Sequence, residues 1–246
     1  MTFTNLRKDS FKSATLWIAF FVWFLPILIS CSDGKEPSEE AALPDDTESF
    51  TFFDIGRTTK FSGQIRQELE EKLGRDAIER RSILDLEINY RGFIKKYFPR
   101  LENLNRQLNF PPGERVEHNT VKLMYRYAQR QNVPFDYVEL VFSEYTQTPI
   151  MFKINFKKDE ANIIETLKKK YGNPKIIDWS ENNGQSMHWE KDADFLIVSL
   201  VPDQFGKHEY QIAIYFADNL KQLIDTERAE KEEKEQQRAK TGEKAF

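Results

Sequence analysis

The spacing of apolar residues changes along this chain of 246 residues, and the change limits the folds that it can adopt. Between residues 60 and 131, large apolar side chains recur every three or four positions, which places them on one face of a helix. From Tyr137 onward they alternate with other side chains at every second position, as in strands. The sequence therefore predicts an α+β fold, in which an N-terminal helical region packs with an antiparallel sheet.

The helical region is expected to span residues 52–135. A first helix over 60–73 is indicated by apolar residues four positions apart and by Gly74, a natural C-terminal stop. A second apolar stripe over 82–108 is interrupted at Pro99, which predicts a kinked helix or two helices that meet there. A third helix is expected over about 120–131, with Asn119 or Thr120 as its cap.

The sheet region is expected to span residues 136–217. Two strands, near 137–143 and 150–156, alternate so as to form a hairpin with one buried face, on which Ile150 and Phe152 lie together. A helix follows, capped by Asp159 and closed by Gly172. Four further strands are indicated by the segments KIIDW, SMHWEK, FLIVSLV and YQIAIYF. The predicted order is ββαββββ, with the helix covering one face of the sheet.

Residues 218–246 are rich in charges of both signs and lack an apolar stripe beyond Asp225. Pairs four residues apart, such as Glu227 with Lys231 and Glu230 with Lys234, favour a helix by a few tenths of a kcal/mol each. We expect a solvated C-terminal helix or tail. A tail that contacts a partner is the alternative.

The N-terminus has the pattern of an export signal. Arg7, Lys8 and Lys12 precede an uncharged apolar run from Ala14 to Ile29, which is shorter than the roughly 20 residues that span a bilayer. A small residue, Ser30, then precedes Cys31, the single cysteine of the chain. With one cysteine no internal disulfide can form, so the thiol is a chemical handle.

The segment Leu28-Ile29-Ser30-Cys31 resembles the lipobox of bacterial lipoproteins. This resemblance implies that residues 1–30 are a signal peptide, that cleavage falls between Ser30 and Cys31, and that Cys31 carries the lipid that attaches the mature protein to a membrane. The residue after the cysteine is Ser32 instead of the aspartate that retains such proteins in the inner membrane of enteric bacteria. The resemblance therefore implies a place at the periplasmic face of the cell envelope, with the outer membrane favoured if the cell is diderm.

Residues 31–51 are expected to form a lipidated, acidic, flexible tether. Seven acids, one lysine and two prolines occur between Ser32 and Ser49, with Leu43 as the single large aliphatic residue. Such a segment buries too little apolar surface to offset its ordering entropy. As a random coil of this length, its root-mean-square reach is roughly 20–25 Å.

No motif for catalysis, metal or cofactor stands out. His118, His188 and His208 lack local ligand spacing, so we expect neither a metal nor a cofactor. Asp192 and Asp194 have the spacing of a metal-binding pair, but aspartate in a turn between strands is more simply explained by its backbone hydrogen bonds. A carboxylate dyad chosen from Glu139, Glu144 and Asp203 would be arbitrary.

Net charge argues against nucleic acid as a partner. The formal charge of the whole chain is −4, and it becomes −6 once the first 30 residues, which carry +2, are removed. Nucleic acid selects strongly basic surfaces. The run LKKKYGNP, followed by tryptophan-containing strands, faintly resembles small lipoproteins of outer-membrane assembly machinery.

These features favour a non-enzymatic binding or scaffolding module, held at the membrane by its lipid and presenting a folded domain to an envelope protein partner. Two alternatives stay open. An enzyme would need a site assembled from scattered residues, and a carrier of an apolar ligand would need a sizeable dry cavity between the helices and the sheet.

Overall fold

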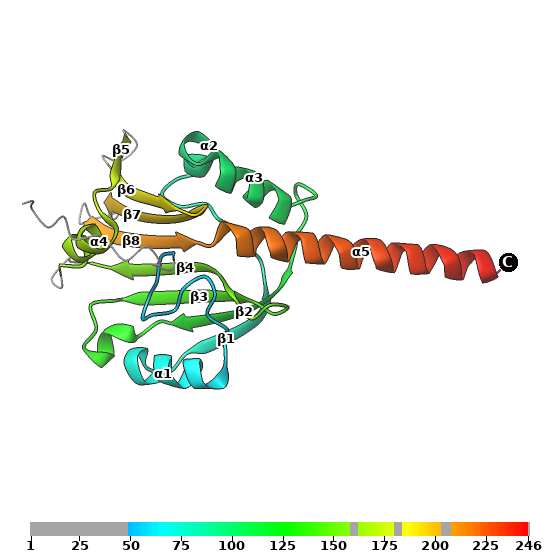
Figure 1. The fold of residues 1–246 in the computed structure, drawn as a ribbon, viewed down its shortest axis with the longest axis horizontal. Helices are drawn as coiled ribbons and strands as arrows, with labels where there is room; N and C mark the ends of the chain where they lie inside the picture. The colour runs from blue at the N-terminus through cyan, green and yellow to red at the C-terminus, as the bar shows by residue number, and fades with distance from the viewer. Residues whose placement is uncertain (1–48, 158–161, 180–183, 203–207, 246) are drawn as a thin grey trace, which may run out of the picture. The chain divides into compact units, whose positions relative to one another are not determined.

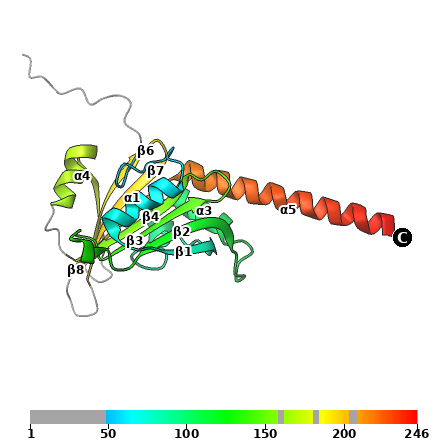
Figure 2. The ribbon, with the colours of Figure 1, turned by 90° about the horizontal axis from the view of Figure 1, so that it is seen from below.

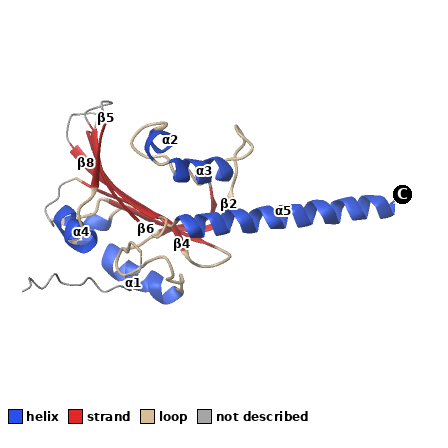
Figure 3. Cartoon of the chain, turned by 45° about the horizontal axis from the view of Figure 1, so that its top comes forward, coloured by secondary structure: helices blue, strands red, loops and turns tan. Residues whose placement is uncertain are grey.

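The computed structural model describes residues 49–157, 162–179, 184–202 and 208–245, which form a sheet covered by helices on both faces (Figures 1 and 3). In chain order the elements are α1 (Gly63–Leu73), β1 (Ala77–Ser82), α2 (Phe93–Tyr97), α3 (Pro99–Leu108), β2 (His118–Tyr125), the short 3-10 helix η1 (Ala128–Gln131), β3 (Tyr137–Ser143), β4 (Pro149–Phe156), α4 (Ile163–Tyr171), β5 (Lys175–Trp179), β6 (Gly184–Lys191), β7 (Asp194–Pro202), β8 (His208–Tyr215) and α5 (Ala217–Ala245). The α+β class predicted from the sequence is confirmed.

All neighbouring strands of the sheet are antiparallel, in the order β1-β2-β3-β4-β8-β7-β6-β5. The order describes two similar halves. Helix α1 is followed by β1 to β4, and helix α4 is followed by β5 to β8, with α2 and α3 inserted between β1 and β2. The last strands of the two halves, β4 and β8, pair at the centre and join them into one sheet.

Two apolar clusters hold the helices to the sheet. One face carries Leu140, Phe152 and Ile214, and against it pack Leu69 and Leu73 of α1 together with the apolar side of α4. The other face carries Ile197 and Tyr215, and is covered by α2, α3 and the first turns of α5 (Figure 3). Figure 2 shows the sheet from the side of α1 and α4. Neighbouring residues of a strand point to opposite faces of the sheet and so reach opposite clusters. Where helices cover both faces, odd and even positions of the strand are therefore both apolar.

Two helical predictions are confirmed in place. Helix α1 begins after Ser62, whose hydroxyl accepts a hydrogen bond from the Ile65 backbone N–H at 3.2 Å, and it ends at Gly74, which adopts a φ of +83°. Two helices meet at Pro99, where α2 ends and α3 begins with the proline in its first turn. Residues 83–92, which were expected to be helical, form an irregular loop instead.

The predicted helix over 120–131 is wrong. Strand β2 occupies 118–125, and η1 forms only a short turn after it. Val121, Leu123 and Tyr125 point into one cluster with period two, while residues between them are partly buried on the other face. Because Met124 on the second face is a large apolar residue too, the clean alternation is lost, and Leu123 beside Met124 imitated a helix.

Strand β1 was not predicted either. It is an edge strand, exposed from Ala77 to Arg81, and its pairing with β2 shifts register near Arg81, which has a φ of +61°. Charged side chains and a bulge are common protections of an exposed sheet edge, and they hide the strand from a search for apolar alternation. Residues 52–135 therefore do not form a separate helical region, because β1 and β2 extend the same sheet.

The strands predicted between residues 137 and 216 are confirmed, and their order with α4 is ββαββββ. One face assignment is wrong. The pairing of β3 with β4 shifts register between Val141 and Phe142, so Ile150 packs with the α2 and α3 cluster while Phe152 packs with the α1 and α4 cluster. Both faces of this hairpin are buried. The predicted cap Asp159 lies outside the described residues.

The first turns of helix α5 belong to the core, and its later turns are exposed. Leu220, Leu223 and Ile224 are buried, so the core continues past residue 217, whereas residues 231–244 are exposed, as predicted for a solvated helix. The predicted pair of Lys234 with Glu230 is present at 3.4 Å. Glu227, which was expected to pair with Lys231, binds elsewhere, as described below. No helix among the described residues has both the length and the apolar character needed to cross a bilayer.

Candidate functional site

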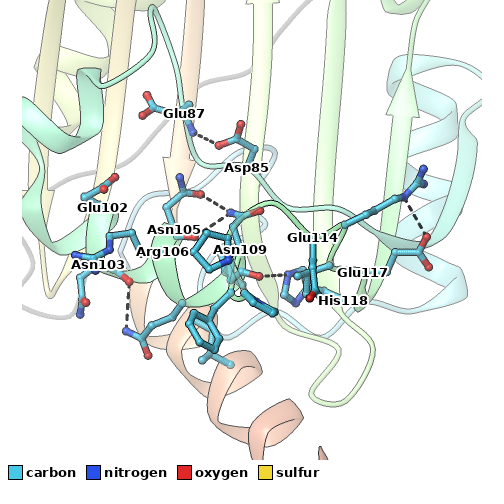
Figure 4. A pocket seen from close by; sticks show the side chains of 18 of the residues that line it. Asp85, Glu87, Glu102, Asn103, Asn105, Arg106, Asn109, Glu114, Glu117 and His118 are labelled. Atoms are coloured by element: carbon cyan, nitrogen blue, oxygen red, sulfur yellow. Dashed lines mark hydrogen bonds and ion pairs between the residues drawn. The ribbon is translucent and has the colours of Figure 1, made fainter.

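A large groove opens on the face of the sheet that carries α2 and α3. Its volume is about 1740 Å³, and its walls are the loop over 83–92, the end of α3, the loop over 109–117 and the part of α5 beyond Ile224. The floor is formed by Tyr137, Lys153, Asn155 and Gln211 of strands β3, β4 and β8. Figure 4 shows part of the lining, with Asp85 and Glu87 on one side and Glu117 and His118 on the other.

The floor belongs to a row of polar residues that crosses five strands, which we call the polar row. In register, Tyr137 of β3 pairs with Asn155, Asn155 with Gln211, Gln211 with Ser199, and Ser199 with Ser186 of β6. Residues directly opposite each other share a face of the sheet, so these five side chains lie side by side. Ser186 and Ser199 are buried and hydrogen-bond each other at 2.7 Å, whereas Tyr137, Asn155 and Gln211 are half-buried in the groove.

The loop over 83–92 is fixed above the sheet by side chains from several elements. Tyr215 donates from its hydroxyl to the Leu86 carbonyl at 2.8 Å, and Lys153 donates from Nζ to the Asp85 carbonyl at 3.0 Å. The Asn89 amide group donates to Ser186 Oγ at 3.2 Å. These contacts hold a segment without regular structure in one conformation, so this wall of the groove is preorganised.

Glu87 and Asn89 bring acceptors into this wall for which the described part of the chain offers no donor. Glu87 Oε1 accepts from the Gly92 N–H at 3.0 Å, but within the described residues Glu87 Oε2 and Asn89 Oδ1 are shielded from solvent and have no hydrogen-bond partner. Burial is the main cause that raises the pKa of Glu87, and the hydrogen bond from Gly92 acts in the opposite direction. The loop therefore carries a destabilised carboxylate.

Lys153 lies on the groove floor, where its stem is packed and its amine reaches the Asp85 carbonyl. Burial lowers its pKa, while the nearby carboxylate of Glu139, its register partner on β3, favours the charged form. Glu139 also accepts a hydrogen bond from the Tyr137 hydroxyl at 2.7 Å. The charges of the floor are thus compensated by neighbours on the sheet.

His118 and Glu227 join the groove wall of α5 to the sheet. His118 is buried at the start of β2, where its Nδ1 lies 2.7 Å from Glu227 Oε2 and its Nε2 lies 3.1 Å from the Leu108 carbonyl oxygen. Glu227 Oε1 accepts from the Asn119 N–H at 2.7 Å. The sequence placed His118 in a loop, and no local pattern linked it to Glu227, which is 109 residues away.

The candidate metal pair of Asp192 and Asp194 serves structure. Asp192 and Ala193 have φ values of +48° and +75° and form the tight turn between β6 and β7, as the sequence predicted. Asp194 is buried, and it accepts from the Arg57 Nε at 2.8 Å and from the Ala217 N–H at 3.0 Å. Burial raises the pKa of Asp194, against the effect of these hydrogen bonds. It holds the N-terminus of α5 in place.

The remaining candidates lie apart from one another. His188 is on β6, as predicted, with its ring edge against Phe98 at 5.0 Å between centroids, and burial lowers its pKa. Glu144 accepts from Arg80 at 2.7 Å on the surface. The side chain of His208, all of Asp203, and the predicted processing and lipidation residues Ser30 and Cys31 fall outside what the structure describes.

Among the described residues, no group of three or more histidine, cysteine, aspartate or glutamate side chains is placed to hold a metal ion. The groove can instead offer a polar ligand several carboxamide, hydroxyl and charged groups on a fixed surface. Sequence reasoning missed this site, because its floor is made by residues whose proximity depends on strand register. Comparison of the chain with protein-family models, curated protein sequences and solved structures finds no significant match.

Proposed function

We propose that this protein is a lipid-anchored, non-enzymatic binding or scaffolding module of the cell envelope, which faces the periplasm and holds an envelope component in its groove. The anchor is Cys31, in the setting of Leu28, Ile29 and Ser30, and the outer membrane is favoured over the inner membrane in a diderm cell. The groove is the observation that carries the binding role.

The groove supports binding because the histidine that lines it, His118, is already engaged, with both ring nitrogens facing acceptors. Outside the groove, both oxygens of Asp194 accept hydrogen bonds. Each of these groups fastens α5 to the sheet. What faces the open volume is a fixed polar surface, which is the property that a recognition site needs.

The lining argues against the carrier of an apolar ligand. Such carriers use largely apolar pockets with few polar groups. Here the floor and walls expose carboxylates, amines and carboxamides, with Lys153 and Gln211 on the floor itself.

The anchor is tested by the intact mass of the membrane-bound protein. We expect the mature chain to begin at Cys31 and to carry added acyl mass, because two or three long chains bind stably at about 0.8 kcal/mol per buried CH₂. Two variants on either side of Cys31 form a matched pair. Ser30→Phe should block cleavage of the signal peptide before Cys31, and Ser32→Ala should not. A membrane protein that retains Met1 with an unmodified thiol would overturn the lipid anchor.

The binding role is tested by a photoreactive phenylalanine analogue placed at position 110 or at position 127 in living cells. Phe110 lines the groove with 68% exposure, and Tyr127 is a similarly exposed aromatic residue, at 60%, away from it. We expect a discrete crosslinked product from position 110 and none from position 127. No product from position 110, or equal products from both, would contradict a binding role for the groove.

A further inference from the structure

The groove is larger than a site for one small molecule. Pockets for such ligands typically enclose about 300–1,000 Å³, whereas this groove has about 1740 Å³ and continues along α5 as far as Glu235. This size suits an extended chain, or a part of one, better than a single small molecule.

The charge of the groove excludes strongly charged chains. Its lining contains eight carboxylates and six lysine or arginine side chains, so charges of both signs are present. One of these pairs is in direct contact, with Arg115 Nε 3.5 Å from Glu117 Oε1. Without one dominant sign, the groove neither concentrates polyanions such as nucleic acid nor selects strongly basic segments.

The polar row supplies the chemistry of recognition. Asn155 and Gln211 are direct neighbours across β4 and β8, and their Cβ atoms are therefore about 4.5–5.5 Å apart. Each carboxamide has two N–H donors and a carbonyl acceptor. A hydroxyl group also donates and accepts, so two adjacent carboxamides match neighbouring hydroxyl groups on one ligand. Tyr137 adds a phenol at the next strand, and three strands cover roughly 10 Å.

Phe110 gives the rim a second recognition element. Its ring is 68% exposed, on a loop where Pro111 and Pro112 follow it. Exposed single aromatic residues are common, but this ring stands at the edge of a polar groove. The C–H face of a sugar ring can pack against such a ring while the hydroxyl groups around its edge stay available to polar side chains.

We propose that the groove binds an oligosaccharide of little or no net charge, with one sugar ring stacked on Phe110 and hydroxyl groups bound by Asn155 and Gln211. A peptide is the alternative occupant, and the titration described below distinguishes it from a sugar. This proposal rests on the binding role proposed above, and it names the chemical class of the ligand.

The test is isothermal titration of the full mature protein in detergent with three probes. These are a β-1,4-linked N-acetylglucosamine tetrasaccharide, maltotetraose, and a glycine-serine peptide of similar length. We expect at least one sugar to bind and the peptide not to bind. Failure of both sugars to bind at millimolar concentration would overturn the proposal, and so would binding of the peptide alone.

Two matched pairs of variants locate the binding. Gln211→Leu should raise the Kd for the sugar about tenfold, the equivalent of about 1.4 kcal/mol, while Gln64→Leu on α1, at the opposite face of the sheet, should not. Phe110→Ala should weaken binding several-fold, while Tyr127→Ala should not. Equal effects within each pair would place the sugar elsewhere and refute the site.

Thermal unfolding checks that each variant is folded, and both aromatic substitutions are at exposed positions. The outcome is separable from that of the proposed function. If neither sugar binds but the photoreactive residue at position 110 still gives a discrete crosslink to a protein, the sugar proposal is refuted. The proposed binding role is then supported, with a protein as the ligand.

Discussion

At the scale of single residues, the buried polar groups of this protein do two different things. His118, Glu227 and Asp194 use nearly all their hydrogen-bonding capacity to fix α5, so their burial is compensated. Glu87 and Asn89 each keep a shielded acceptor without a donor among the described residues. The first group secures the fold, and the second weakens the loop that walls the groove.

Replacing His118 tests the first group. His118→Ala removes the partner of Glu227 Oε2 and of the Leu108 carbonyl, and leaves a partly buried carboxylate with one donor fewer. We expect a loss of about 2–3 kcal/mol in the free energy of unfolding, measured by chemical denaturation at neutral pH. His188→Ala is the matched control and should cost less, because Nδ1 of that ring has no partner in the described structure. A larger loss for His188→Ala would contradict this assignment.

Replacing Glu87 tests the second group. Because its pKa is raised in the folded chain, Glu87 favours the folded state fully below the ordinary value of 4.5, and this contribution is lost as the pH rises through the raised value. Glu87→Gln keeps an oxygen for the Gly92 N–H but cannot ionise. The free energy of unfolding should therefore fall less between pH 4.5 and neutrality in the variant than in the wild type. Identical pH profiles would show that Glu87 is not the destabilised carboxylate.

At the scale of helices and strands, burial separates elements that the sequence pattern treats alike. Phe152 of β4 is fully buried, whereas no residue of α4 is, and Ile163 is only partly covered. The central strands therefore carry the stability, and α4 adds less than its apolar spacing suggested.

Alanine substitutions measure this difference. We expect Phe152→Ala to lower the free energy of unfolding by roughly 3–5 kcal/mol, because it opens a cavity in the centre of the sheet. Ile163→Ala should cost clearly less. Ile176→Ala on the edge strand β5, where the side chain is 51% exposed, should stay within about 0.5 kcal/mol of the wild type. Equal losses at residues 152 and 163 would contradict the observed packing.

Truncation of α5 separates its core from its surface. Removing residues 236–246 takes away no side chain that is buried in the described part of the chain, where 236–244 are exposed, and should leave the Tm unchanged. Removing residues 226–246 also removes Glu227, so the Tm should fall although Leu220, Leu223 and Ile224 remain. A lower Tm for the shorter deletion would show that the exposed helix contributes to folding.

At the scale of the described domain, the two halves of the sheet should unfold together. They share the β4 and β8 pairing, and the apolar clusters on both faces extend across both halves. If the signal is removed as proposed, the mature chain has two tryptophans, Trp179 and Trp189, both in the second half. Fluorescence then reports that half alone, and far-ultraviolet circular dichroism reports the whole domain. We expect the two unfolding curves to coincide. Separate midpoints would mean that the halves are independent.

The sequence by itself determined the elements whose signals are local. Gly74 ends α1, Pro99 separates α2 from α3, and period-two alternation marks β3 and β4, because each signal depends on a few neighbouring residues. The turn role of Asp192 was predictable for the same reason. The proposed lipid attachment at Cys31 depends on local sequence as well, and it stays a prediction.

Only the tertiary structure decided which residues of distant segments meet. Strand β2 was not predicted because Met124 on its partly buried face adjoins Leu123 on its buried face, and β1 was not predicted because an edge strand needs no apolar alternation. The groove depends on strand register, since a shift of one residue would turn Asn155 or Gln211 to the other face. Strands β4 and β8 pair although they lie more than fifty residues apart in the sequence. The side-chain pattern of one strand does not predict which residues of the other strand pair with it.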